Sequence, residues 1–209
     1  MYLPISMLTT QGDSAGFGRM AASFHFPLLG EPLSLDLVNT RVRRGGIDVD
    51  LLETPAALAA WLRAESARLA WSGAVEAADL QAVQGLRAAL AVVLAARRDG
   101  ARPAAAALRQ LNMALAVPAT TSRLAWPATG PRLVRPSATS QRDALLHVLA
   151  VDAVAVLTGP SGKLLRECAH PDCVLQFVAN HPRRRWCSAT GCGNRARVAQ
   201  HYKRQQADG

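Results

Sequence analysis

Hydrophobic residues in the middle of the chain recur every three or four positions, which is the spacing of a helix that buries one face. In the longest such segment the apolar positions are Leu80, Val83, Leu86, Leu90 and Val93. This helix is expected to end near residues 97–100, where two arginines and a glycine are typical of a helix C-terminus. A shorter helix is predicted from Pro55 to about Leu69, because Thr54 is a favourable N-cap and proline suits the first helical position.

Two more helices and a hairpin are predicted farther along. Pro103 begins an alanine-rich helix, and Ser140 caps another one, with Asp143 at the reciprocal capping position. Between these helices, "RLAWPA" and "RLVRPS" flank a Thr-Gly-Pro turn and predict a short β-hairpin. We place this hairpin at the edge of the protein, because prolines do not suit a central strand. The Gly-Pro that follows the last helix predicts a linker near residues 159–163.

Composition agrees with a mainly α fold. The chain has 209 residues, half of them hydrophobic but only 5% aromatic, which favours helices over a β-sandwich. No apolar run approaches the roughly eighteen residues that would span a bilayer. Residues 1–28 lack the basic and apolar regions of a secretory signal, so we expect a disordered or loosely attached lead-in, with Met20 as a candidate start. The expected compartment is the cytoplasm.

Positive charge is concentrated at the C-terminal end. Residues 1–162 carry fifteen basic and twelve acidic side chains, whereas residues 163–209 carry nine basic and three acidic ones. Such a block favours a polyanionic partner, most simply nucleic acid. A solvated basic tail that keeps the protein soluble would give the same pattern.

All four cysteines lie in this basic segment, as two close pairs. Four residues separate Cys168 from Cys173, thirteen residues follow, and four residues again separate Cys187 from Cys192. Two close pairs joined by a span long enough to fold back are the layout of a four-thiolate zinc site. A module this small buries little core, so the metal would supply folding free energy.

Two alternatives use the same residues differently. Two disulfides could form, but a cytoplasmic chain disfavours them. Histidines could replace cysteines as ligands, since His170 and His181 lie between the cysteines and His201 follows them. However, four thiolates already complete a tetrahedral zinc site.

The segments around the cysteines predict a treble-clef-like finger over residues 163–209. Residues 173–178 and 184–187 flank the turn-rich "ANHPR" and predict a short hairpin between the two cysteine pairs. After Cys192 an uninterrupted run of helix formers predicts a helix whose N-terminal dipole would help to hold the thiolates ionised.

Two stripes are expected on this last helix. Arg197, His201 and Arg204 would form one basic, exposed stripe. Val198 and Tyr202 would form another, able to pack on the hairpin and Trp186.

The segment "RRRWCSATGCGNRARVAQHYKR" resembles the CGNR zinc finger, which is named for the Cys-Gly-Asn-Arg found here from Cys192 to Arg195. Upstream, "CAHPDC" fits the first ligand pair of that family. The resemblance covers about Leu165 to Lys203. It implies a zinc ion held by Cys168, Cys173, Cys187 and Cys192.

The N-terminal part also resembles a known family. "LSLDLVNT", an Asp-Leu segment and a Leu-x-x-Trp-Leu helix are similar to the ABATE-type domain, which commonly precedes CGNR fingers. The resemblance implies an ABATE-like domain over residues 29–162. Proteins of this architecture are inferred to be stress-related transcription regulators.

A ligand pocket in this domain is a separate hypothesis. Asp36 and Asn39 are three residues apart and lie close in sequence to three arginines, so they are candidate pocket residues. Alternatively, both hydrogen-bond backbone groups at a turn or helix end. The chain contains no metalloprotease, nucleophile-elbow or phosphate-loop motif, so we do not expect an enzyme.

The leading functional hypothesis is a small regulator that binds nucleic acid, most simply DNA, through the finger. The helical domain would form a homodimer or sense a ligand. Most contacts should be to phosphates and should position the finger without reading bases. The candidate contact residues are Arg183, Arg184, Arg195, Arg197, His201, Lys203 and Arg204. The alternative is a zinc-dependent protein-interaction module, in which Arg195 braces the fold, or a ligand sensor without direct DNA binding.

Overall fold

A computed structural model of the chain describes residues 24–116, 123–134 and 140–207. The predictions for residues 1–23, including the candidate start at Met20, lie outside the described residues. Residues 24–28 of the expected lead-in are described, and Phe26 among them packs against the N-terminal core. This last part of the lead-in is therefore attached to the body.

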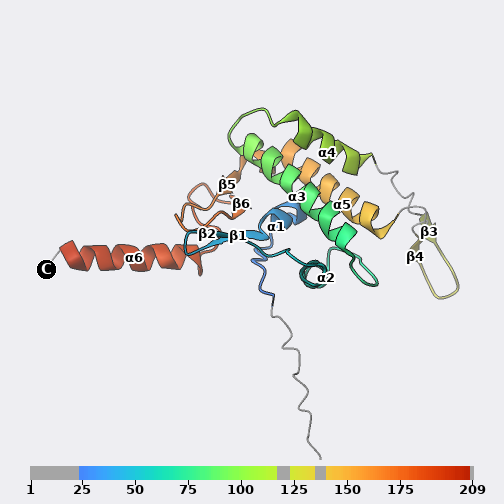
Figure 1. Cartoon of the computed structure of the whole chain (residues 1–209), viewed down its shortest axis with the longest axis horizontal. Coiled ribbons are helices and arrows are strands. Elements are labelled where there is room, and N and C mark those ends of the chain that lie inside the picture. The colour runs from blue at the N-terminus through green and yellow to red at the C-terminus, as the bar shows by residue number, and fades with distance from the viewer. Residues whose placement is uncertain (1–23, 117–122, 135–139, 208–209) are drawn as a thin grey trace, which may run out of the picture.

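Helices form the body of the protein, as predicted. α3 (Ala77–Arg98) packs against α4 (Ala105–Leu115) and α5 (Gln141–Thr158), and these three helices lie side by side in Figure 1. The short α1 (Leu33–Val38) packs against α3 and α5, and α2 (Pro55–Ala64) packs against α3. All five apolar positions predicted for α3 are buried in the core.

Local sequence signals set most helix ends. Thr54 Oγ1 accepts a hydrogen bond from Ala57 N at 3.1 Å, which confirms the predicted N-cap of α2. Ser140 Oγ accepts from Asp143 N at 3.0 Å at the start of α5. The prediction that α2 continues to Leu69 is wrong: the helix ends at Ala64, and the next residues turn so that Arg68 reaches buried carboxylates.

α3 is long and apolar enough to cross a membrane by length and composition alone, with a mean hydropathy of 1.3 over its most apolar window. Arg87 and Arg97 interrupt this helix, so its uninterrupted apolar run is much shorter than eighteen residues. Half of that window is buried inside the protein, where α3 contacts α1, α4 and α5. Its apolar character is therefore that of a core helix, which passes the same test.

In the part of the chain that the structure describes, three two-stranded antiparallel hairpins accompany the helices. β3 (Arg123–Ala125) and β4 (Arg132–Val134) form the predicted hairpin at the periphery (Figure 1). β1 (Arg41–Arg44) and β2 (Ile47–Asp50) form one that was not predicted. The third, β5 (Leu165–Glu167) with β6 (Gln176–Val178), belongs to the finger.

The predicted hairpin between the two cysteine pairs is wrong. Residues 184–187 were expected to pair with the strand at residues 173–178. Instead β6 pairs with β5, with Leu165 opposite Val178. The ladder continues through a hydrogen bond from Cys168 N to Leu175 O at 2.9 Å. The first cysteine pair therefore closes the loop of the β5–β6 hairpin, instead of preceding a hairpin.

The predicted linker is a structured connection. Residues Pro160–Lys163 form a 3₁₀ helix, η1, that packs against α5 and α3, and Gly162 within it is buried. β5 follows two residues later and also contacts α3. The finger is thus held directly against the helical body.

One amide side chain and one carboxylate from the N-terminal part form hydrogen bonds with the outer edge of β6. Asn39 Oδ1 accepts from Gln176 N at 2.8 Å, and Asn39 Nδ2 donates to Gln176 O at 2.9 Å. Glu31 Oε2 accepts from Val178 N at 2.9 Å. The side chains of α1 and its approach thus replace a third strand beside β6.

Hydrophobic packing also crosses the boundary between the two parts. Val42 of β1 belongs to the buried cluster that contains the four cysteines and Phe177. In return, Leu165 of β5 belongs to the core cluster of the helical body. The finger and the N-terminal part therefore share their cores.

Replacing Asn39 with alanine tests this junction. Asn39→Ala should lower the free energy of unfolding by about 2–4 kcal/mol, because the N–H and C=O of Gln176 would be buried without partners. Urea unfolding of the zinc-loaded protein measures the change. Asn112→Ala, at an exposed position of α4, is the matched control. Equal losses for the two variants would contradict the junction.

Candidate metal centre

The four cysteine sulfurs converge on one point, as the spacing predicted. Their Sγ atoms all lie within 4.8 Å of one another, and the four residues are buried and free of disulfides. One pair comes from the loop after β5, and the other flanks the turn that leads into α6 (Cys192–Ala207). Two separate loops of the finger thus supply two cysteines each.

The sulfur separations fit a zinc ion. Tetrahedral Zn–S bonds of about 2.3 Å place neighbouring sulfurs about 3.8 Å apart. The Sγ of Cys173 lies 3.9 Å from that of Cys187, which lies 3.6 Å from that of Cys192. Four thiolates leave no coordination position for water or substrate, so the zinc held by these cysteines would have a structural role.

Neighbouring groups support the thiolates. Arg195 Nη2 donates to Cys192 Sγ at 3.0 Å, and Cys187 N donates to Cys168 Sγ at 3.4 Å. The alternative histidine ligands serve in turns: His170 Nδ1 accepts from Asp172 N and His181 Nδ1 accepts from Arg183 N, both at 3.1 Å.

The thiols hold their protons unequally when no ion is bound. A hydrogen bond with Cys187 lowers the pKa of Cys173 to about 5. The same hydrogen bond raises the pKa of Cys187, and burial raises the pKa of Cys168. At neutral pH both of these thiols are therefore protonated until a metal displaces the protons.

Close packing at one position and positive φ at two others explain three glycines near the site. A Cβ on Gly193 would lie 3.2 Å from both Ser188 O and Trp186 Cδ1, so glycine lets the indole rest on the start of α6. Gly45 and Gly46 have positive φ in the β1–β2 turn, and their N–H groups donate to the Asp172 carboxylate at 3.1 and 2.8 Å. The unpredicted β1–β2 hairpin thereby contacts the first cysteine loop.

Two of the predicted nucleic-acid contacts have internal partners. Arg184 donates to the carbonyls of Val178 and Cys187 at 3.0 and 2.8 Å and to Glu31 Oε1 at 2.9 Å. Its guanidinium also lies 4.3 Å from the centre of the Phe177 ring. Arg184 therefore joins the finger to the N-terminal part, and Arg195 is held by the Cys192 sulfur.

The other five predicted contacts are exposed. Arg183 lies in the loop after β6, and Arg197, His201, Lys203 and Arg204 lie on α6. Of the residues on α6, Arg197 donates from Nη2 to Ala189 O of the finger loop at 3.1 Å. α6 extends away from the body, as Figure 1 shows, so these side chains are accessible.

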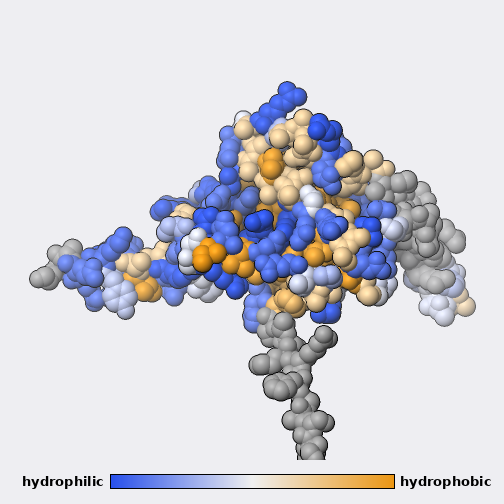
Figure 2. Space-filling model, in the orientation of Figure 1, coloured by the Kyte–Doolittle hydropathy of each residue, from blue (hydrophilic) through white to orange (hydrophobic). Residues whose placement is uncertain are grey.

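The expected packing of the second α6 stripe is wrong. Val198 and Tyr202 are 46% and 62% exposed instead of lying on the hairpin. Trp186 packs at Gly193, in the first turn of the helix, and the helix leaves the finger after that turn. The surface of α6 in Figure 2 is mostly hydrophilic with a small hydrophobic area.

Arg185 is an exposed cation that was not among the predicted contacts. Its guanidinium lies 5.3 Å from the centre of the Trp186 ring, beside the second cysteine pair. Arg183 and Arg184, which precede it, are predicted contacts. The run of three consecutive arginines would therefore have indicated Arg185 as well.

The predicted ligand pocket at Asp36 and Asn39 is not formed. Both side chains are about 99% buried: Asn39 bonds the β6 backbone, and Asp36 pairs with Arg68. Burial raises the pKa of Asp36 to about 6 in spite of that arginine. The alternative of backbone hydrogen bonding describes Asn39, although its partner lies in the finger.

Zinc binding should release protons. Because the pKa values of Cys168 and Cys187 are raised, at least two protons must leave per zinc at neutral pH. The apparent affinity should then rise about 100-fold or more per pH unit near pH 7, and fall as the pH is lowered. Chelator competition at several pH values measures this slope. A slope below two protons would contradict the protonation states described.

Removing the Arg195 guanidinium should weaken the metal site. Arg195→Gln should lower zinc affinity about 10–100-fold, the usual cost of losing a partner that supports a ligand. Arg204→Gln, in the last turn of α6, is the control and should leave the affinity unchanged. Equal affinities for the two variants would show that the contact with Cys192 does not stabilise the site.

Comparison with protein families gives two matches. Residues 31–160 match the ABATE family, described as "Putative stress-induced transcription regulator", and residues 165–205 match the CGNR zinc finger. A comparison with curated proteins found no match. The two matched segments span the helical body and the metal centre, and the chain belongs to the ABATE family, with a CGNR zinc finger at its C-terminal end.

Proposed function

We propose that this protein is a transcription regulator that binds DNA through its zinc finger and α6. The observation that carries the proposal is the basic helix that begins at a metal ligand and then leaves the body. Zinc held by the cysteines would fix the first turn of this helix, and the body would fix its direction. The rest of the helix would be free to contact a partner.

Charge and dimensions support a nucleic-acid partner. Residues 174–207 contain no acidic side chain. The 16 residues of α6 span about 24 Å, and a helix about 10–12 Å wide fits the major groove of B-DNA. The exposed cations of this region are Arg183, Arg185, Arg195, Arg197, Lys203 and Arg204. None of them forms an ion pair with a carboxylate in the described part of the chain.

The proposal assigns separate roles to the two parts. Phosphate contacts by the exposed cations would position α6, and zinc held by thiolates is a net dianion that Arg195 partly offsets. The body would set the orientation of the arm and could form a homodimer. We place the protein in the cytoplasm, where thiols stay reduced, and assign it no catalytic activity.

A protein partner is the second candidate function. Val198 and Tyr202 lie four residues apart on α6 and are exposed, which offers a small apolar contact beside the cations. A partner that binds this stripe should be captured by the intact protein after nuclease treatment. Loss of that capture on nuclease treatment would favour nucleic acid.

Binding to DNA should depend steeply on salt. If about five phosphates are neutralised, the slope of log K against log salt should be near −4 to −5. Fluorescence anisotropy of labelled mixed-sequence duplex DNA with the zinc-loaded protein measures this slope. No binding at low salt would contradict the proposal and leave the protein-partner function in its place.

Charge reversal on α6 identifies the surface. Arg197→Glu with Arg204→Glu should weaken binding to all sequences and reduce the magnitude of the salt slope by about 2. Arg63→Glu with Arg109→Glu makes the same change of charge at exposed positions of α2 and α4. An equal loss in both double variants would show that net charge, and not α6, governs binding.

A further inference from the structure

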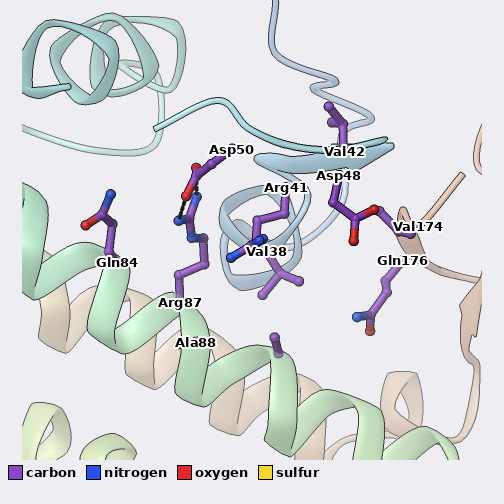
Figure 3. Close-up of a pocket in the computed structure, with 11 residues that line it drawn as sticks. Val38, Arg41, Val42, Asp48, Asp50, Gln84, Arg87, Ala88, Val174 and Gln176 are labelled. Carbon is purple, nitrogen blue, oxygen red and sulfur yellow. Dashed lines mark hydrogen bonds and ion pairs between the residues drawn. The ribbon is translucent and has the colours of Figure 1, made fainter. Parts of the chain in front are cut away.

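A cavity of about 440 Å³ lies where the body, the β1–β2 hairpin and the finger meet (Figure 3). Its walls come from α3, from β1 and β2, from the end of α1, and from the residues at the start of β6. This volume is in the range of small-molecule sites. Because Val174 and Gln176 belong to the finger, the cavity exists only while the finger is docked.

Most charged groups of the cavity are already paired. Arg87 donates to the Asp50 carboxylate from both Nη1 and Nη2, and Asp48 pairs with Arg43 at 2.7 Å. Arg41 also lines the cavity, and in the described part of the chain it forms no ion pair with a carboxylate. Figure 3 shows its guanidinium reaching into the space over α3.

Gln176 supplies an unpaired acceptor on the finger side. The residue is only 8% exposed, and its Oε1 atom is buried and accepts no hydrogen bond from the described residues. Asn39 bonds both the N–H and the C=O of Gln176, which fixes the position of this residue in the cavity wall. Figure 3 shows this side chain directed into the same space as Arg41. A buried acceptor without a donor is costly, which points to a partner supplied from outside the chain.

The remaining walls are apolar except for Gln84, whose Nε2 donates to Leu52 O at 2.7 Å. The apolar residues are Val38, Val42, Ala88, Ala91 and Val174. A cavity that combines this apolar surface with one cation free of ion pairs and one unpaired acceptor is suited to an amphipathic organic acid. Its carboxylate would face Arg41, and an O–H or N–H group on the same molecule would face Gln176.

We propose that this cavity binds a small apolar carboxylic acid that also carries a hydrogen-bond donor. The carboxylate accepts from Arg41, the donor group bonds Gln176 Oε1, and the apolar body fills the space against α3. The bound acid would stabilise the docked finger, because it contacts both parts of the molecule. This inference does not depend on the nature of the partner of α6.

Calorimetry on the zinc-loaded full chain tests the site with three defined probes: 4-hydroxybenzoate, 4-hydroxyphenylacetate and indole-3-acetate. At least one should bind with saturation at one site. For a hydroxy acid that binds, the methyl ester removes the charge and the O-methyl ether removes the donor. For indole-3-acetate, the methyl ester and the N-methyl derivative do the same. Each change should weaken binding about tenfold, as expected for a hydrogen bond to a charged or buried group.

Variants of the chain locate the binding. Ala88→Leu should abolish it by filling the cavity from an exposed position of α3, whereas Ala106→Leu on α4 should leave it unchanged. Arg41→Gln should weaken binding of the acids about tenfold and leave that of the methyl esters unchanged. Absence of saturable binding for all three acids at millimolar concentration would overturn the proposal. Binding that persists in Ala88→Leu would overturn it too, because the acid would then lie elsewhere.

Discussion

The pairing of Asn39 and Glu31 with the outer edge of β6 is the interaction on which the rest of the structure depends. These side chains satisfy both backbone groups of Gln176 and the N–H of Val178. Without them the edge of a three-residue strand would be buried unpaired, at a cost of about 1–3 kcal/mol per group. Because β6 leads back to the first cysteine pair, the same contacts hold the metal centre against the helical body and orient α6.

Arginines that look alike in sequence divide into internal and external ones once this junction is formed. Glu31 bonds β6 with one carboxylate oxygen and Arg184 with the other, and Arg195 lies against a metal-binding sulfur. Within residues 174–207, the exposed cations lie on α6 and in the loop that follows β6. Positive charge is therefore displayed on an arm whose root is the metal site, while the core of the finger is shared with β1.

Features of the fold that depend on residues close together in the chain could be predicted from the sequence. The caps at Thr54 and Ser140, the buried face of α3 and the convergence of four cysteines depend on residues near each other or on a metal that selects sulfur. The β1–β2 hairpin could have been predicted from the Gly-Gly turn between two short strands. The partners of Asn39 and Arg184 could not, since they lie 137 and 153 residues away in the chain. The predicted strand pairing within the finger is wrong because the true partner, β5, precedes the first cysteine, whereas the hairpin was predicted between the two cysteine pairs.

Amide hydrogen exchange of the full chain, with zinc and after its removal by a chelator, tests most directly whether the finger and the body form one unit. If the β6 edge joins them, zinc removal should speed exchange in α1 and in β1 and β2 as well as in residues 165–207, because the backbone partners of Asn39 would be lost. Faster exchange confined to residues 165–207 would show that the metal centre folds independently and would contradict the shared junction.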